Sequence, residues 1–194
     1  MKRLFIIAGC NGAGKTTASY TILPDILDCN EFVNADEIAK GLSPFNPDKS
    51  SFQAGRLMLE RIRELIKTRG NFAFETTLST KSYKNFVIEA QKSGFEVTLL
   101  FFYLQSPELA LKRVKTRVEE GGHNIPPNVI KRRYENGLKN FFGIFKPIVD
   151  KWIFIDNSEN GFKKTIAKGD IKEERIENLE TWNFLKEKYD EGKR

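Results

Sequence analysis

The strongest chemical signal in the sequence is a glycine-rich segment that ends in a lysine and a threonine. Residues 9–16 read Gly-Cys-Asn-Gly-Ala-Gly-Lys-Thr, which matches the pattern G-x-x-x-x-G-K-[ST] at every fixed position. In this pattern backbone N–H groups surround a phosphate, the lysine reaches the β- and γ-phosphates of a nucleotide, and the hydroxyl contacts Mg²⁺. The residues expected to bind the nucleotide are Gly9, Asn11, Gly12, Ala13, Gly14, Lys15, Thr16 and Thr17.

The surroundings of this segment fit the motif. An apolar strand-like run, residues 4–7, precedes it, and a helical pattern begins at Thr17. The N-terminus of a helix adds a positive partial charge where the phosphate would lie. A glycine-rich turn that binds nothing would need neither a preceding strand nor a following helix. The presence of both therefore favours nucleotide binding. The sequence lacks an Asn-Lys-x-Asp guanine signature, which argues against a GTPase.

A pair of carboxylates follows the second predicted strand. Asp36 and Glu37 come shortly after the apolar run at residues 31–33. In open α/β sheets, ligands bind beyond the carboxyl ends of the strands, and a carboxylate there can accept the proton of a substrate hydroxyl during phosphoryl transfer. Asp36 is nearer the strand end and is the candidate base. The alternative is that Asp36 caps a helix that begins at Glu37, and sequence geometry leaves both open.

The third predicted strand, residues 72–74, also ends in polar residues. Glu75 at its end can hold Mg²⁺ or a substrate hydroxyl, and Thr76 and Thr77 can donate hydrogen bonds to a substrate. The alternative is a polar cluster that caps the next helix. The expected metal-binding residues are Thr16 and Glu75. The expected substrate-binding residues are Asp36, Glu75, Thr76 and Thr77.

A basic segment lies beyond the fourth predicted strand. Helices are expected over residues 107–118 and 127–142, separated by a turn that contains Gly-Gly and Pro-Pro. Arg113 and Arg117 are four residues apart and share a helical face. We interpret residues 113–133 as a lid over the nucleotide, with Arg113 and Arg117 contacting it and lid arginines stabilising the transferred phosphoryl group. A solvated basic hairpin is the alternative.

The elements that must position these residues alternate along the chain. Strand-length apolar runs occur at residues 4–7, 31–33, 72–74, 97–104 and 152–155, with helical patterns between them. Strands that alternate with helices predict an α/β fold with a parallel sheet. Beyond them, residues 163–169 suit a short edge strand, and residues 172–188 suit a charged helix with a stripe made of Ile176, Leu179, Trp182 and Leu185.

Composition narrows the possible classes of function. The 194 residues suit a single domain, with a charged C-terminal extension from about residue 160. One histidine and two cysteines exclude disulfide frameworks, zinc clusters and histidine-based triads. The formal charge of +6 mildly favours an anionic partner. The longest apolar run, residues 97–104, is far too short for a membrane span, so we expect a cytoplasmic protein without a membrane partner.

Taken together, the motifs resemble the zeta toxin-like family of small phosphate-loop kinases. The resemblance extends over about residues 3–158. Beyond the phosphate loop, it rests on residues 34–39 (Asn-Ala-Asp-Glu-Ile-Ala), 74–79 (Phe-Glu-Thr-Thr-Leu-Ser), 113–117, 121–126 (Gly-Gly-His-Asn-Ile-Pro), 132–134 (Arg-Arg-Tyr) and 156–158 (Asp-Asn-Ser).

The resemblance implies a fold, a reaction and roles for residues. The fold would be the nucleoside-kinase-like, three-layer P-loop NTPase fold, with a five-stranded parallel sheet and a helical lid. The best-known members use ATP and Mg²⁺ to phosphorylate a hydroxyl of UDP-N-acetylglucosamine. Asp36 matches the family's proton-accepting aspartate, and Lys15 matches its phosphate-binding lysine. The lid arginines map to Arg117 and to either Arg133 or Arg132. Any antitoxin would be a separate chain.

Two other functions are compatible with the sequence. The basic lid could serve a kinase that acts on a polynucleotide end or on a nucleoside. However, the aromatic residues of its second helix lie at helical spacing, which is typical of a core stripe, so nucleic acid is not the expected partner. A nucleotide-binding regulatory module without transferase activity is the second alternative, although such a module needs no base at Asp36.

Overall fold

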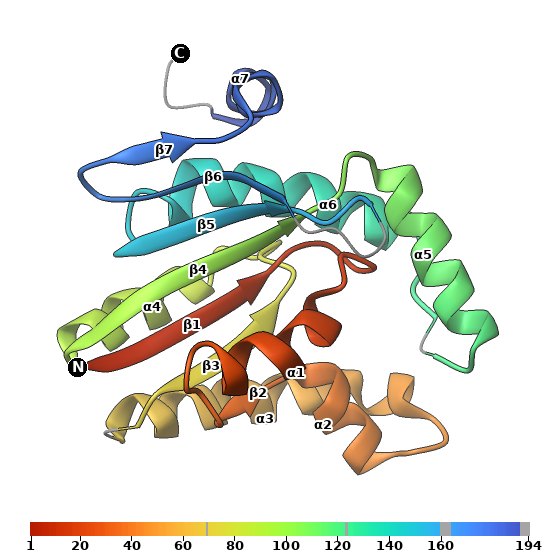
Figure 1. Ribbon diagram of the computed structural model, residues 1–194. Helices are drawn as coiled ribbons and strands as arrows, with labels where there is room; N and C mark the ends of the chain where they lie inside the picture. The colour runs from red at the N-terminus through yellow and green to blue at the C-terminus, as the bar shows by residue number, and fades with distance from the viewer. Residues whose placement is uncertain (69, 123, 160–163, 191–194) are drawn as a thin grey trace.

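The computed structural model describes residues 1–68, 70–122, 124–159 and 164–190, and a seven-stranded sheet forms its centre (Figure 1). The strands lie in the order β2-β3-β1-β4-β5-β6-β7. Their bounds are β1 Lys2–Ala8, β2 Phe32–Val33, β3 Phe72–Thr76, β4 Phe95–Tyr103, β5 Lys151–Asp156, β6 Lys164–Asp170 and β7 Glu174–Ile176. The strands from β2 to β5 in this order pair in parallel, whereas β6 and β7 are antiparallel to their neighbours.

The parallel part confirms the predicted α/β architecture, but the prediction of a sheet with only five parallel strands is wrong. Strand β6 pairs with the outer edge of β5, and β7 pairs with β6. A parallel sheet that stopped at β5 would leave the unpaired N–H and C=O groups of that strand exposed. The antiparallel extension satisfies these groups and moves the sheet edge to a strand of three residues.

The register of the central strands places the predicted site residues at one edge of the sheet. Strand β1 pairs with β3 so that Ala8 lies opposite Thr76, and it pairs with β4 so that Ala8 lies opposite Phe101. The chain therefore leaves β1 into the phosphate loop at the level where β3 ends in Glu75 and Thr76. The carboxyl ends of parallel strands are where such folds bind ligands.

The helices flank the sheet and, in one case, extend past its end. Their bounds are α1 Lys15–Asp25, α2 Ala35–Leu42, α3 Pro47–Lys67, α4 Tyr83–Lys92, α5 Pro107–Glu119, α6 Pro127–Asn140 and α7 Leu179–Tyr189, with a π-helical turn at Phe141–Phe145. Figure 1 shows α5 beyond the end of the sheet toward which β1 and β4 point. None of the helices within the described residues combines the length and apolar character needed to cross a membrane.

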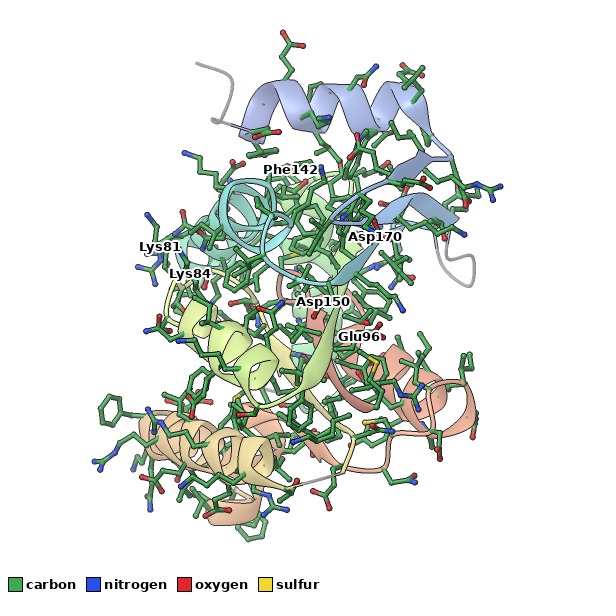
Figure 2. The ribbon with its side chains drawn as sticks, turned by 90° about the vertical axis from the view of Figure 1, so that its left-hand side faces the viewer. Lys81, Lys84, Glu96, Phe142, Asp150 and Asp170 are labelled. Atoms are coloured by element: carbon green, nitrogen blue, oxygen red, sulfur yellow. The ribbon has the colours of Figure 1, made fainter. Side chains whose placement is uncertain are left out.

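Helix α7 docks on the sheet through a buried aromatic cluster. Trp182 is fully buried, and its ring stacks on that of Trp152 from β5 at a centroid distance of 5.2 Å and an interplanar angle of 6°. Phe142 from the π-helical turn lies 5.2 Å from Trp182 by the same measure and is found beneath α7 in Figure 2. The segment beyond the parallel sheet is therefore part of the hydrophobic core.

The predicted helix over residues 172–188 is partly wrong. Residues Glu174–Ile176 form β7, and the helix begins only at Leu179. The side chain of Asn178 caps it by accepting a hydrogen bond of 3.1 Å from the backbone N–H of Thr181. Within the predicted stripe, Trp182 and Leu185 are buried, whereas Leu179 is 61% exposed.

Replacing Trp182 by alanine is expected to lower the free energy of unfolding by about 3–5 kcal/mol, the usual cost of truncating a buried tryptophan. Phe184→Ala on the same helix is the matched control. Phe184 is 58% exposed, and a surface substitution of this kind is expected to cost about 0.5 kcal/mol or less. Urea denaturation followed by circular dichroism measures both. Equal losses in the two variants would contradict the docking role of Trp182.

Candidate active site

The phosphate loop, residues 9–16, connects β1 to α1 and turns tightly against neighbouring segments. Gly9 has a φ of 141°, and a Cβ atom there would collide with the carbonyl oxygen of Phe102. Gly14 has a φ of 75°, and its Cβ would lie 2.5 Å from Nδ2 of Asn157. Only glycine combines such φ values with such close approach. The two motif glycines are therefore required by the local geometry.

The motif lysine and threonine both meet the carboxylate of Glu75. Lys15 is buried, and its Nζ donates to the carbonyl oxygen of Cys10 at 3.0 Å and lies 3.4 Å from Oε1 of Glu75. The hydroxyl of Thr16 donates to Oε2 of Glu75 at 2.8 Å. The structure thus brings together three residues that the sequence analysis assigned to nucleotide and metal binding. Glu75 bonds to the phosphate loop and does not cap the next helix.

The oxygen atoms of Thr16 and Glu75 are suited to Mg²⁺. Mg²⁺ prefers hard oxygen ligands and is usually held by one or two protein side chains, with phosphate oxygens and water completing its shell. A hydroxyl and a carboxylate 2.8 Å apart, beside a phosphate-binding loop, supply that donor set. The metal assignment of Thr16 and Glu75 is therefore consistent with the geometry.

Asn34 is a site residue that was not predicted from the sequence. Its Oδ1 accepts hydrogen bonds from the backbone N–H groups of Asp36, at 2.8 Å, and Glu37, at 3.4 Å, so Asn34 is the cap of α2. Its Nδ2 donates to Oε2 of Glu75 at 3.0 Å. The alternative that Asp36 caps the helix is therefore wrong. The signal available in the sequence was an asparagine directly before a helix, one of the residue types that most favour a cap.

A pocket of about 230 Å³, called here the carboxylate pocket, collects the predicted substrate residues. Asp36, Glu75, Thr76 and Thr77 all line it, together with Lys15. The remaining lining residues are Asn11, Asn34, Ala35, Met58, Ser79, Thr80, Tyr83 and Arg133. Apart from Met58 and Ala35, every one of them carries a polar group. The pocket is therefore equipped to bind a small polar molecule beside Lys15.

A larger pocket of about 790 Å³, called here the arginine pocket, lies on the other side of the phosphate loop. It is lined by Gly12, Gly14, Thr17, Leu109, Lys112, Arg113, Thr116, Arg117, Glu120, Asn157, Ser158 and Glu159. Its volume lies in the range of pockets that enclose drug-sized ligands, about 300–1,000 Å³. Loop residues Asn11 and Lys15 line the carboxylate pocket, whereas Gly12 and Gly14 line the arginine pocket. The phosphate loop therefore separates the two pockets.

Arg113 has a structural contact in addition to its place in the arginine pocket. Its guanidinium donates to the carbonyl oxygens of Asn157 and Ser158 at 2.8 and 2.9 Å. Asn157 in turn donates from Nδ2 to the carbonyl oxygen of Ala13 at 2.8 Å. Arg113 thereby ties the segment after β5 to α5, and Asn157 ties the same segment to the phosphate loop. Its predicted contact with the nucleotide, like that of Arg117, stays a prediction.

Among the two candidate arginines of the second lid helix, the geometry favours Arg133. Its Nη1 donates to Oδ1 of Asn11 in the phosphate loop at 3.1 Å, and its side chain lines the carboxylate pocket with Asp36. Burial lowers the pKa of Arg133, an effect that the charge of Asp36 opposes. Arg132 is exposed and lines neither pocket. Of this pair, Arg133 lines the same pocket as Lys15 and Arg132 does not, so the prediction that a lid arginine contacts the phosphoryl group is kept for Arg133.

A model of the zeta toxin family matches residues 1–160. The chain belongs to the zeta toxin family. The matched region contains the phosphate loop, both pockets and residues 113–133, the predicted lid, whereas β6, β7 and α7 lie beyond it. An uncharacterised protein of Haemophilus influenzae is 33% identical over 126 residues, which make up 65% of this chain and 88% of that protein.

Solved structures confirm the kinase-like fold of this zeta toxin family member. The AvrRxo1-ORF1:-ORF2 structure with ATP matches with a TM-score of 0.75 and 18% identity over all of this chain and 65% of that chain, so the present chain spans less than two thirds of its length. A PezAT toxin–antitoxin structure from Streptococcus pneumoniae matches with a TM-score of 0.63 and 18% identity, over 84% of this chain and 72% of that chain. Shikimate kinase from Acinetobacter baumannii matches with a TM-score of 0.51 and 17% identity, over 82% of this chain and 86% of that chain.

Proposed function

We propose that this member of the zeta toxin family is a kinase that uses ATP and Mg²⁺ to phosphorylate a hydroxyl group of a small molecule. The observation that carries the proposal is the position of the phosphate loop between two pockets. Lys15 and Asp36 face the carboxylate pocket, whereas Gly12 and Gly14 face the larger arginine pocket. Family membership and the ATP complex of the AvrRxo1 structure support ATP as the donor.

In the proposed reaction the acceptor hydroxyl lies in the carboxylate pocket and the nucleotide in the arginine pocket. The carboxylate of Asp36 takes the proton of the acceptor hydroxyl while the oxygen of that hydroxyl attacks the γ-phosphorus of ATP. The bond between that phosphorus and the β–γ bridging oxygen breaks, and ADP leaves. Lys15 and Arg133 stabilise the charge on the transferred group. Thr16 and Glu75 would hold Mg²⁺, which would supply positive charge beside the phosphate groups.

The proposed acceptor is UDP-N-acetylglucosamine or a related sugar nucleotide. Hydroxyl side chains from Thr76, Thr77, Ser79 and Thr80 surround the carboxylate pocket, and they can exchange hydrogen bonds with the hydroxyl groups of a sugar. A volume of about 230 Å³ is smaller than that of pockets that enclose drug-sized ligands. The pocket would therefore hold the sugar, and the nucleotide part would lie outside it.

An antitoxin encoded as a separate chain is the proposed protein partner. The PezAT structure represents a toxin–antitoxin system, and the AvrRxo1-ORF1 structure is a complex with a second protein. The proposed location is the cytoplasm, where ATP is available. Two free buried cysteines, Cys10 and Cys29, suit a reducing compartment.

The proposal is tested by incubating the protein with Mg²⁺ and γ-labelled ATP against a panel of acceptors. The panel contains UDP-sugars, free sugars, nucleosides and an oligonucleotide with a 5′-hydroxyl end. We expect the label on a UDP-sugar. Label on the oligonucleotide or on a nucleoside would replace the proposed acceptor with the corresponding alternative. Slow release of phosphate with no labelled acceptor would overturn the kinase proposal in favour of a nucleotide-binding regulatory module.

A further inference from the structure

The loop after β3, residues 76–80, has an unusual backbone conformation in the middle of the carboxylate pocket's wall. Leu78 has a φ of 57°, and its side chain is fully buried. A left-handed conformation is a genuine outlier for a bulky residue that is not glycine. Such conformations persist only where surrounding contacts hold them, and they cluster at functional sites. On either side of Leu78, Thr77 and Ser79 line the pocket. We call this segment the acceptor loop.

One of the contacts that hold Leu78 comes from within the loop, and another comes from α6. The hydroxyl of Thr76 accepts a hydrogen bond of 3.0 Å from the backbone N–H of Leu78. From α6, Nδ2 of Asn140 donates to the carbonyl oxygen of Leu78 at 2.8 Å. Asn140 is only 6% exposed, and the role proposed above for the pocket residues does not involve it. Both backbone polar groups of the strained residue are thus satisfied.

Gly137 lets α6 approach the acceptor loop closely. A Cβ atom at this position would lie 2.8 Å from the carbonyl oxygen of Thr77. A backbone oxygen at that distance cannot move away without moving the loop. The next glycine along the chain, Gly143, has nothing within 4 Å of its Cβ position. The close approach is therefore specific to Gly137.

The same face of α6 also reaches the phosphate loop. Arg133, Gly137 and Asn140 are separated by four and three residues, so they lie on one helical face. Arg133 bonds to Asn11 of the phosphate loop, and the other two residues contact the acceptor loop. A single helix thus sets the position of a phosphate-binding arginine and of the loop that carries the pocket hydroxyls.

We propose that α6 is the positioning element for the acceptor, and that Gly137 and Asn140 hold the acceptor loop in the conformation that presents Thr77 and Ser79 to the carboxylate pocket. The inference rests on the proposed function in one respect, namely that this pocket binds the acceptor. Neither residue touches the acceptor. Loss of the Asn140 donor leaves the carbonyl oxygen of Leu78 buried without that partner. The free energy of the loop then falls if Leu78 relaxes toward a negative φ.

The experiment uses Asn140→Leu and Gly137→Ala, with Gly143→Ala as the matched control. The KM for UDP-N-acetylglucosamine and the KM for ATP are measured for each variant. We expect the KM for the sugar nucleotide to rise about tenfold in the first two variants, since a displacement of about 1 Å in a positioning segment has effects of this size or larger. The KM for ATP should change much less. The control should match the unmodified protein in both constants.

Hydrogen exchange of the Leu78 amide, followed by NMR, gives a second readout that requires no acceptor. We expect faster exchange in Asn140→Leu and Gly137→Ala, relative to the amide of Ile6 in the centre of the sheet, which reports global opening. Exchange equal to that of the control would overturn the proposed hold on the loop. Faster exchange without a selective rise in the acceptor KM would overturn its role in acceptor binding.

The two proposals fail in different ways. If no acceptor of the panel is phosphorylated by the unmodified protein, the proposed function is wrong. The exchange rates then still decide whether Gly137 and Asn140 hold residues 76–80. If the unmodified protein phosphorylates UDP-N-acetylglucosamine and the variants keep its KM, the proposed function stands and the positioning role of α6 is wrong.

Discussion

Replacing Asp36 by asparagine is expected to lower kcat for phosphoryl transfer by about 10²–10⁴-fold, the usual contribution of a general base. The substitution keeps the size of the side chain and removes its ability to take a proton. It also leaves the start of α2 intact, because Asn34 caps the helix through the backbone N–H of Asp36 and not through its carboxylate. The transfer rate is measured with γ-labelled ATP and the acceptor identified in the panel.

Glu37→Gln is the control for this experiment. Glu37 is the neighbouring carboxylate, but its side chain pairs with Lys40 at 2.8 Å on the protein surface and does not line the carboxylate pocket. We expect this variant to transfer phosphate at the unmodified rate. Full transfer by Asp36→Asn would show that the reaction needs no base at this position. Loss of transfer in Glu37→Gln alone would show that Glu37, and not Asp36, is the base.

Local motifs made the phosphate-loop side of the candidate site predictable. The phosphate loop could be recognised because its function depends on backbone conformation and on a fixed spacing of glycine, lysine and threonine. Glu75 could be placed beside it because parallel strands bring their carboxyl ends to one edge of the sheet. The structure agrees, since Thr16 bonds to Glu75 across 59 positions of sequence. The sequence did not decide which of Arg132 and Arg133 matches the lid arginine of the family, because the two are adjacent and equally basic.

Contacts between distant polar residues were not predictable in the same way. Asn157 bonds to the carbonyl oxygen of Ala13 across 144 positions, and Asn140 bonds to that of Leu78 across 62. An asparagine that makes such a contact looks the same in a sequence as one that faces solvent. The left-handed conformation of Leu78 was equally hidden, because leucine carries no turn signal. The contacts of Asn157 and Asn140, and the conformation of Leu78, are apparent only in the folded structure.

The C-terminal segment shows why a helical pattern can mislead. Ile176, Leu179, Trp182 and Leu185 recur every three residues among charged neighbours, which is typical of an amphipathic helix. In the structure Ile176 belongs to β7, a strand of three residues that is too short to show an alternating pattern. Strand pairing at the edge of the sheet overrode the helical pattern there. The buried pair Trp182 and Leu185 was read correctly because the helix does begin at Leu179.

Replacing Arg133 by methionine is expected to lower kcat for phosphoryl transfer by about 10³-fold, the lower end of the contribution of an arginine that stabilises the transferred phosphoryl group. Methionine keeps the length and packing of the side chain and removes its charge. Arg133 is the arginine that contacts Asn11 and lines the carboxylate pocket with Lys15 and Asp36. The loss should therefore fall on kcat, with a smaller change in the KM for ATP.

Arg132→Met separates this role from a general effect of lid charge. Arg132 is exposed and lines neither pocket, so its removal lowers the net charge by the same amount without reaching the reacting phosphate. We expect Arg132→Met to retain the unmodified kcat. Arg133→Lys adds a test of geometry, because lysine keeps the charge but lacks the planar group that can bridge Asn11 and a phosphate. Equal losses in Arg132→Met and Arg133→Met would contradict the assignment and indicate that the lid acts through its overall charge.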